Sequence, residues 1–167
     1  MKPPKYSLAE IERRWLVQAA YLAEFADRPY RLIEDIYIEQ SLLRLRRIQA
    51  ADGEVTYKLC KKYGRGDSLS NPITNIYLSQ DEYLALCALP GMRIRKHRHA
   101  VEGGAIDIYL CAPSLAIFEI DFDTEQAAAN YLPPSFVTAE ITDDSTWSGA
   151  ALAMRFGSRI KGNAIGP

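Results

Sequence analysis

The 167-residue chain has little of what marks a disulfide-rich, zinc-binding or membrane-embedded protein. It contains three cysteines and two histidines. Cys60, Cys87 and Cys111 are widely spaced and form no Cys-x-x-Cys pair, so we expect reduced thiols that pack as small hydrophobic side chains. His97 and His99 have no third ligand nearby in the sequence, which argues against a zinc site.

Positive and negative charges are nearly balanced. Lys and Arg total 20 and Asp and Glu total 21, giving a net charge of −1, and no charged tail that would suit a nucleic-acid partner is present. No apolar run reaches the roughly 18 residues that a membrane-spanning helix needs. The first residues, Met1 to Ser7, are followed by no apolar stretch typical of a signal peptide. We therefore expect a cytoplasmic protein with no membrane partner.

Short alternating segments separated by turn residues dominate the sequence, which shows no repeat and no linker. We predict a single domain, residues 1–167, built mainly of strands. The Ala51 to Gly53 turn predicts a hairpin, Gly103 and Gly104 predict another turn, and Gly64 to Ser68 predict a loop. The strands are predicted at Leu8–Val17, Arg31–Ile38, Leu42–Ile48, Glu54–Cys60, Ile73–Leu78, Met92–His99, Ala105–Leu110, Leu115–Phe122 and Phe136–Thr142.

Two helices interrupt the strands. Ser79 and Glu82 have the spacing of a capping box, and the helix that follows should end before Pro90. A second helix is predicted from Thr124 to Leu132, before two prolines. About nine strands with few helices predict an antiparallel barrel or sandwich, with the helices packed outside.

Charged residues recur at alternate positions of the predicted strands. Glu10 and Glu12 share a strand face with Arg14, opposite Ile11 and Trp15. The same spacing recurs at Arg44 and Arg46, at Lys96 and Arg98, and at Glu119 and Asp121, while Asp107 stands alone between two isoleucines. Carboxylate pairs favour a cation, and Arg and Lys pairs favour an anion. Several such faces turned inward would form a polar bore that is hydrated or occupied, because burying unpaired charges is costly.

These residues resemble the CYTH superfamily, the triphosphate tunnel metalloenzymes. Glu10–Val17 is similar to the ExExK opening of the family. The later motifs follow in order over residues 8–153, namely Arg44–Arg46, Thr56–Lys58, Arg95–Arg98, Ile106–Tyr109, Phe118–Phe122 and Ala139–Asp144, the last resembling an EVTDD signature. The resemblance implies an α+β fold with a closed antiparallel eight-stranded β-barrel, a tunnel, and helices packed outside it.

The resemblance also implies an activity, metal-dependent hydrolysis of a small triphosphate. Inorganic triphosphate is the first expectation, with nucleoside or thiamine triphosphate as other substrates. Carboxylate ligands suit Mg²⁺ or Mn²⁺, and the implied metal ligands are Glu10, Glu12, Glu119, Asp121 and Asp107. The implied phosphate-binding residues are Arg14, Arg44, Arg46, Lys58, Lys96 and Arg98. Glu10, Glu12, Arg14 and Lys58 are the implied catalytic set. Asp107 and Glu140 are candidates for a second metal or for orienting a water or a lysine, and Asp143 and Asp144 are expected to be loop or capping residues.

The sequence departs from the family pattern at three places. Arg14 replaces the last Lys of ExExK, and Asp121 is shorter than the usual Glu. The strand from Pro72 to Leu78 contains no acid, although relatives often carry glutamates there. Adenylate cyclase activity is one alternative, because some CYTH proteins cyclise ATP. A catalytically weak polyphosphate- or nucleotide-binding module is another, consistent with the missing acids around Thr74. A monomer and a homodimer are both open, as is whether the segment from Met154 to Pro167 plugs the tunnel.

Overall fold

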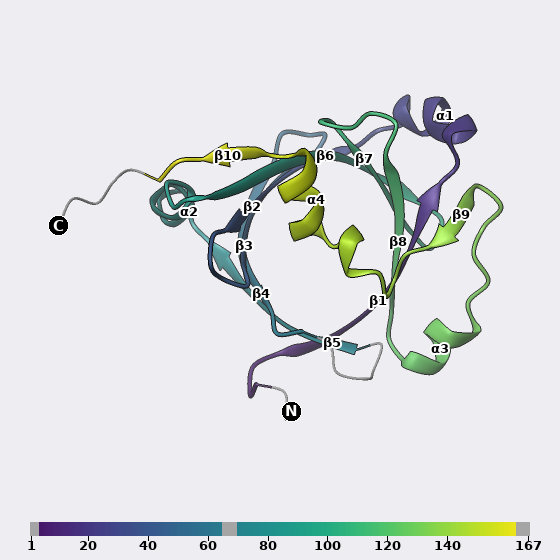
Figure 1. Ribbon diagram of the computed structural model, residues 1–167, viewed down its shortest axis with the longest axis horizontal. Coiled ribbons are helices and arrows are strands. Elements are labelled where there is room, and N and C mark those ends of the chain that lie inside the picture. Colours follow the sequence, from purple (N-terminus) through teal and green to yellow (C-terminus); the bar gives the residue numbers. More distant parts are fainter. Residues whose placement is uncertain (1–3, 65–69, 163–167) are drawn as a thin grey trace.

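The computed structural model describes residues 4–64 and 70–162, which form one closed β-barrel (Figure 1). Of the loop predicted from Gly64, only Gly64 itself lies within the described residues. The strands are β1 (Leu8–Val17), β2 (Arg31–Ile38), β3 (Leu43–Gln49), β4 (Val55–Lys62), β5 (Ser70–Leu78), β6 (Gly91–Val101), β7 (Gly104–Tyr109), β8 (Ala116–Phe122), β9 (Val137–Glu140) and β10 (Ser158–Ile160). The predicted closed antiparallel eight-stranded barrel of an α+β protein is confirmed.

Eight strands close the barrel in the order β6-β2-β3-β4-β5-β1-β8-β7, and β7 returns to β6. All the pairings are antiparallel. Outside this ring, β9 extends the sheet from β1 and β10 extends it from β6. The predicted hairpin turn joins β3 to β4, and Gly53 adopts a φ of 92° there, a left-handed conformation that favours glycine.

Of the four α-helices in the described part of the chain, α1 (Leu22–Ala26), α2 (Gln80–Cys87) and α3 (Glu125–Asn130) lie against the outside of the barrel (Figure 1). The predicted capping box is present, since Ser79 accepts a hydrogen bond from the Glu82 N–H and the Glu82 carboxylate accepts one from the Ser79 N–H. The Thr124 hydroxyl caps α3. The sequence prediction missed α1 and also the fourth α-helix. No helix in the described part of the chain is long and apolar enough to cross a membrane.

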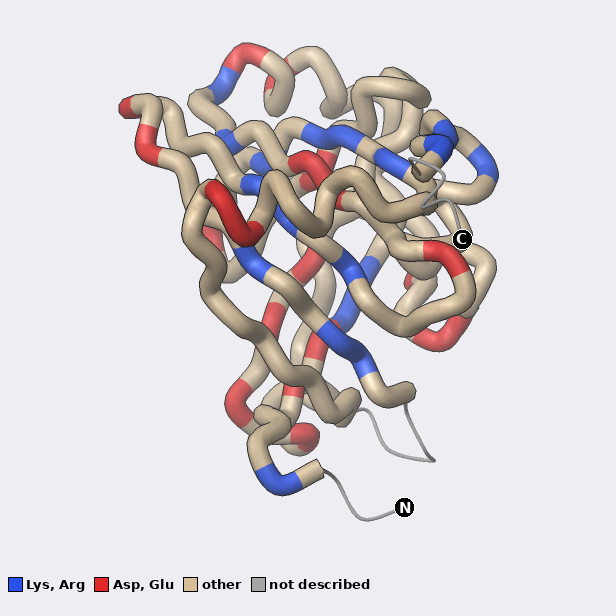
Figure 2. Tube along the Cα trace, turned by 90° about the vertical axis from the view of Figure 1, so that its left-hand side faces the viewer, with Lys and Arg blue, Asp and Glu red and all other residues tan. Residues whose placement is uncertain are grey.

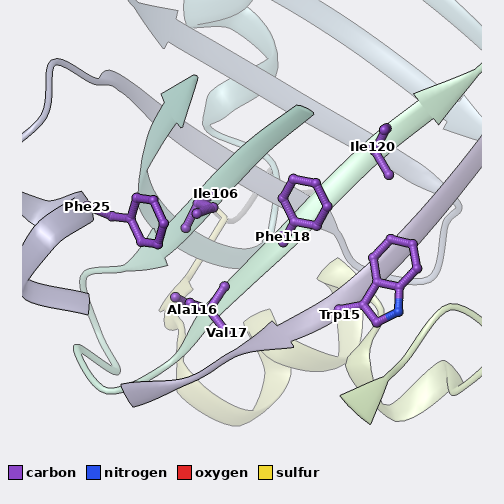
Figure 3. Packing of buried hydrophobic residues seen from close by; sticks show 7 residues of the cluster. All are labelled: Trp15, Val17, Phe25, Ile106, Ala116, Phe118 and Ile120. Carbon is purple, nitrogen blue, oxygen red and sulfur yellow. The ribbon is translucent and has the colours of Figure 1, made fainter. Parts of the chain in front are cut away.

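The outward faces of β1, β7 and β8 carry the largest apolar core (Figure 3). Trp15, Ile106 and Phe118 alternate with bore-facing residues on these strands and are almost completely buried. Phe25 from α1 packs against them, and Phe136 approaches Phe118 with ring centroids 5.4 Å apart. This packing outside the barrel leaves the bore free for polar side chains.

The fourth α-helix, α4 (Gly149–Phe156), closes one end of the barrel. Its buried residues Leu152 and Ala153 pack on apolar side chains that face the bore, among them Ile94 and Ile117. After α4, the chain adds β10 to the edge of β6. Of the segment from Met154, whose place the sequence left open, residues 154–156 form the end of α4, whereas Ser158–Ile160 form β10 at the edge of β6 and do not plug the bore. The plug is α4, so the prediction that the helices pack outside the barrel does not hold for this helix.

Candidate active site

The bore beyond the α4 plug holds a cavity of about 1790 Å³. Figure 2, turned by 90° from Figure 1, shows that basic residues (Lys and Arg, blue) and acidic residues (Asp and Glu, red) are distributed along the strands of the barrel. Ten of the eleven residues predicted to form the site line this cavity, namely Glu10, Glu12, Arg14, Arg44, Arg46, Lys58, Lys96, Arg98, Glu119 and Asp121. Alternate residues of separate strands therefore converge on one shared interior.

The acidic side of the cavity is formed by the adjacent strands β1 and β8. Glu12 lies opposite Asp121 in the strand register, and Arg14 lies opposite Glu119. Burial raises the pKa of Glu12 to about 7, with repulsion from Glu119 as the next cause. Burial also raises the pKa of Asp121, helped by the charges of Glu10 and Glu119. Negative charge is thus incompletely compensated on this side, a condition that favours a bound cation.

Glu119 behaves differently because it faces the basic side chains. Burial alone would raise its pKa, but the charges of Lys96, Arg98 and Arg14 hold the pKa well below its usual value. Arg98 contacts one Glu119 oxygen, and the Arg14 Nε lies 3.2 Å from the other. Glu119 therefore joins the acidic side of the cavity to the basic side.

Arg14 is held at three points. Its Nε lies 3.6 Å from Glu12 as well as close to Glu119. Its Nη1 donates a hydrogen bond of 2.9 Å to the carbonyl of Trp147, in the segment that leads into α4. Arg14 thus connects the carboxylates of the cavity to the plug that closes its end.

The basic side of the cavity depends on Asp35, a residue that the sequence prediction did not include. Asp35 is almost completely buried on β2 and accepts two hydrogen bonds from Arg46, at 2.6 and 2.7 Å. The Nε of Arg44 lies 3.8 Å from the same carboxylate. In the sequence, Asp35 lies two residues from Ile33 and two from Tyr37, so the three side chains share one face of β2. This alternation could have identified Asp35 as a site residue.

Asp107 is the one predicted site residue that does not line the cavity. It is fully buried, and its carboxylate accepts hydrogen bonds from Arg98 at 2.7 and 2.6 Å and contacts Lys96. Both oxygens are occupied by these cations. The structure thus gives Asp107 a positioning role for Lys96 and Arg98, and its predicted role as a metal ligand does not fit this geometry.

Lys62 is a cavity residue that the sequence prediction missed. It forms an ion pair with Glu10. Burial lowers the pKa of Lys62, but the charges of Glu12 and Glu10 outweigh this effect and raise it. Lys58, Cys60 and Lys62 alternate along β4 and all line the cavity, so extending the predicted strand by two residues would have identified Lys62.

The acidic residues near the C-terminus, Glu140, Asp143 and Asp144, are not part of the acidic side formed by β1 and β8. Glu140 forms a bidentate pair with Arg13 on the outside of the barrel, at 2.8 and 2.6 Å. Asp144 caps the 3₁₀ helix at Ser145–Trp147 by accepting a hydrogen bond from the Thr146 N–H, which confirms its predicted capping role. Asp143 and Asp144 both reach the cavity margin.

The carboxylates of the cavity are the candidate ligands for a divalent metal. Within the described residues, no three His, Cys, Asp or Glu side chains gather closely enough to hold a metal ion by themselves. Mg²⁺ is commonly bound by one or two carboxylates together with water and substrate phosphates. The paired carboxylates of β1 and β8, with the raised pKa values of Glu12 and Asp121, would fit a metal of that kind if other ligands completed its coordination.

Comparison with known proteins gives structural neighbours only. No protein-family model matches the sequence, and no curated protein matches it. A crystal structure described as the hypothetical protein NE1496 has 24% identity and a TM-score of 0.50, covering 87% of this chain and 97% of that chain. A crystal structure described as the inorganic triphosphatase NE1496 has 23% identity and a TM-score of 0.51, covering 88% and 95%. These likenesses establish a shared fold.

Proposed function

We propose that the protein hydrolyses a triphosphate in the barrel cavity with the help of Mg²⁺ or Mn²⁺, with inorganic triphosphate as the first expected substrate. The observation that carries the proposal is the convergence of two carboxylate pairs, the six predicted Arg and Lys side chains and Lys62 on one cavity. The motifs that resemble the triphosphate tunnel metalloenzymes supply most of these residues. The likeness to the fold of the inorganic triphosphatase NE1496 is consistent with the same activity.

The residues divide the work by charge. Arg44, Arg46, Lys58, Lys96 and Arg98 would bind phosphate oxygens, the arginines in bidentate fashion. Glu10, Glu12, Glu119 and Asp121 would hold the divalent ion on the opposite side. The ion, when bound, would neutralise phosphate charge and favour attack by water. Phosphoryl transfer depends mainly on such positioning and charge stabilisation.

Two buried carboxylates would keep the phosphate-binding side chains in place. Asp35 orients Arg46, and Asp107 orients Lys96 and Arg98. A substrate that enters this cavity meets cations whose directions are already set, so little side-chain ordering remains to be done on binding.

The test is a product analysis with tripolyphosphate, ATP and thiamine triphosphate, each with Mg²⁺ or Mn²⁺. A triphosphatase releases inorganic phosphate from at least one of them, and Glu10→Gln and Glu12→Gln abolish the release. An adenylate cyclase would instead yield pyrophosphate and cyclic AMP, and a binding module would yield affinity without product. Glu54→Gln, an exposed glutamate in the β3–β4 turn, is the matched control. Full turnover in Glu12→Gln on every active substrate would refute the proposal.

A further inference from the structure

Tyr77 lies on the bore-facing side of β5, in the part of this strand that pairs with a neighbouring strand along one edge only among the described residues. Among the described residues, the pairing of β1 with β5 begins at Leu8 and Ile73. From Thr74 to Leu78, the strand neighbour that the structure describes is β4 alone. Tyr77 lies four residues after Ile73, which lines the cavity, so both side chains are on the same face of β5. The Tyr77 side chain is 69% exposed. Tyr77 is not itself one of the lining residues, and its ring lies beside Lys58, which is. We call this position the rim of the cavity.

One face of this ring is held by a cation of the site. The Nζ of Lys58 lies over the Tyr77 ring, 4.7 Å from its centroid. Lys58 lines the cavity, and no ion pair joins it to any carboxylate in residues 4–64 and 70–162. The ammonium fixes the ring from one side, while the high exposure of Tyr77 leaves ring surface open to a ligand.

The bore face of β5 is neutral, unlike the faces beside it. β4 presents Lys58 and Lys62 to the cavity, and β1 presents Glu10 and Glu12, whereas β5 contributes two asparagines and an isoleucine. Of these, Asn75 is exposed and lies two residues from Tyr77 on the same face. Its amide offers both hydrogen-bond donors and an acceptor. This strand suits an uncharged polar and aromatic group better than phosphate or metal.

The size of the cavity points the same way. At about 1790 Å³, it exceeds the 300–1000 Å³ or so of pockets that bury a drug-sized ligand. Three phosphates and a metal ion would fill a small part of it. Room therefore remains in the cavity for a further group of the ligand.

We infer that Tyr77 and Asn75 form a subsite for the flat aromatic group of an organic triphosphate, such as a nucleobase. The base stacks on the open face of Tyr77, the Asn75 amide hydrogen-bonds the base or the sugar, and the phosphates extend past Lys58 toward Arg46. Stacking on a tyrosine tolerates any base, because every base has a π face. This inference rests on the proposed function, since the phosphate end must bind in the cavity.

The test compares an organic ligand with an inorganic one in the same variants. Calorimetry measures the Kd of adenosine 5′-(β,γ-imido)triphosphate with Mg²⁺, and phosphate release gives the KM for tripolyphosphate. Tyr77→Ala should raise the Kd about tenfold and leave the KM within twofold, while Tyr77→Phe retains both. Ile76→Ala, on the same strand but facing outward, is the control and should change neither value.

The outcomes separate the two claims. An unchanged Kd in Tyr77→Ala, or an equal rise in Kd and KM, would overturn the subsite. A wild-type protein that hydrolyses tripolyphosphate but does not bind the adenosine analogue would overturn the subsite and leave the proposed function standing. A wild-type protein that binds the analogue but hydrolyses no triphosphate would overturn the proposed function. The subsite would then be judged on Kd alone.

Discussion

The guanidinium of Arg46 donates two hydrogen bonds to the carboxylate of Asp35 on the neighbouring strand, at 2.6 and 2.7 Å. Burial by itself would raise the pKa of Asp35, but the charges of Arg46 and Arg44 outweigh burial and hold the pKa well below its usual value. A buried anion is thereby stable in its charged form. It fixes Arg46, one of the three arginines that we assign to phosphate binding.

Replacing this anion by a neutral group of similar shape should destabilise the fold. Asp35→Asn leaves Arg44 and Arg46 with uncompensated buried charge, at a cost of about 3 kcal/mol in the free energy of unfolding. Glu39→Gln, which breaks a surface pair with Arg159, should cost less than about 1 kcal/mol. Urea unfolding at pH 7 measures both values.

The same pair predicts a pH dependence. Because the folded pKa of Asp35 is depressed, its stabilisation is present above the unfolded value of about 3.9 and is lost as the pH falls toward the folded pKa. The wild type should lose more stability than Asp35→Asn between pH 5 and pH 3. Parallel pH profiles for the two proteins would contradict this account of Asp35.

Glu12 should give the opposite dependence in the metal-free protein. Burial beside Glu119 raises its pKa to about 7, so its protonated form favours the folded state. Its stabilisation is present below the unfolded pKa of about 4.3 and is lost as the pH rises through 7. Unfolding with a chelator present, from pH 5 to pH 8, should show a decline in wild type that Glu12→Gln reduces. A decline of the same size in the variant would show that Glu12 does not titrate in this range.

Arg98 joins Asp107 to Glu119, and its forked geometry is needed for both contacts. Arg98→Lys keeps the charge but cannot reach both carboxylates, so kcat/KM for tripolyphosphate should fall about 100-fold, or ~2.7 kcal/mol. Arg95→Lys on the same strand is exposed and should remain within twofold of wild type. Equal effects of the two substitutions would remove the special role of Arg98.

The start of α4 leaves no room for a side chain at Gly149. A Cβ on this residue would lie 1.9 Å from the Tyr37 hydroxyl oxygen, so Gly149→Ala should shift the start of α4 and lower stability by about 1–3 kcal/mol. Removing the hydroxyl in the double variant Tyr37→Phe/Gly149→Ala should recover part of this loss. Thermal unfolding measures it, and a Gly149→Ala protein as stable as wild type would contradict the tight contact.

Much of the barrel could be predicted because strand periodicity is a local property. The pattern that placed Glu10, Glu12 and Arg14 on one face is set by the pleat alone. Closure of the ring was an expectation from the family resemblance, since the pairing of β7 with β6 depends on residues distant in sequence. α1 was missed because it is only five residues long.

The site was harder to predict where long-range contacts decide a residue's role. Asp107 and Glu119 both alternate with apolar residues, yet only Glu119 lines the cavity, because Lys96 and Arg98 enclose Asp107 from the adjacent strand. The α4 plug could have been predicted from the sequence. The bore face changes from charged to apolar toward one end of β1, at Leu16, and of β8, at Ile117, which indicates a packed end. The choice of metal and substrate stays a prediction.

The central claim is that the carboxylates of β1 and β8 and the basic side chains of the other strands bind one metal–triphosphate complex between them. Anomalous diffraction from crystals of the whole chain grown with Mn²⁺ and tripolyphosphate tests it most directly. We expect a manganese peak within coordination distance of Glu10, Glu12, Glu119 or Asp121, with phosphate density beside Arg44 and Arg46. Manganese or phosphate found only outside the barrel, with the cavity holding water alone, would contradict it.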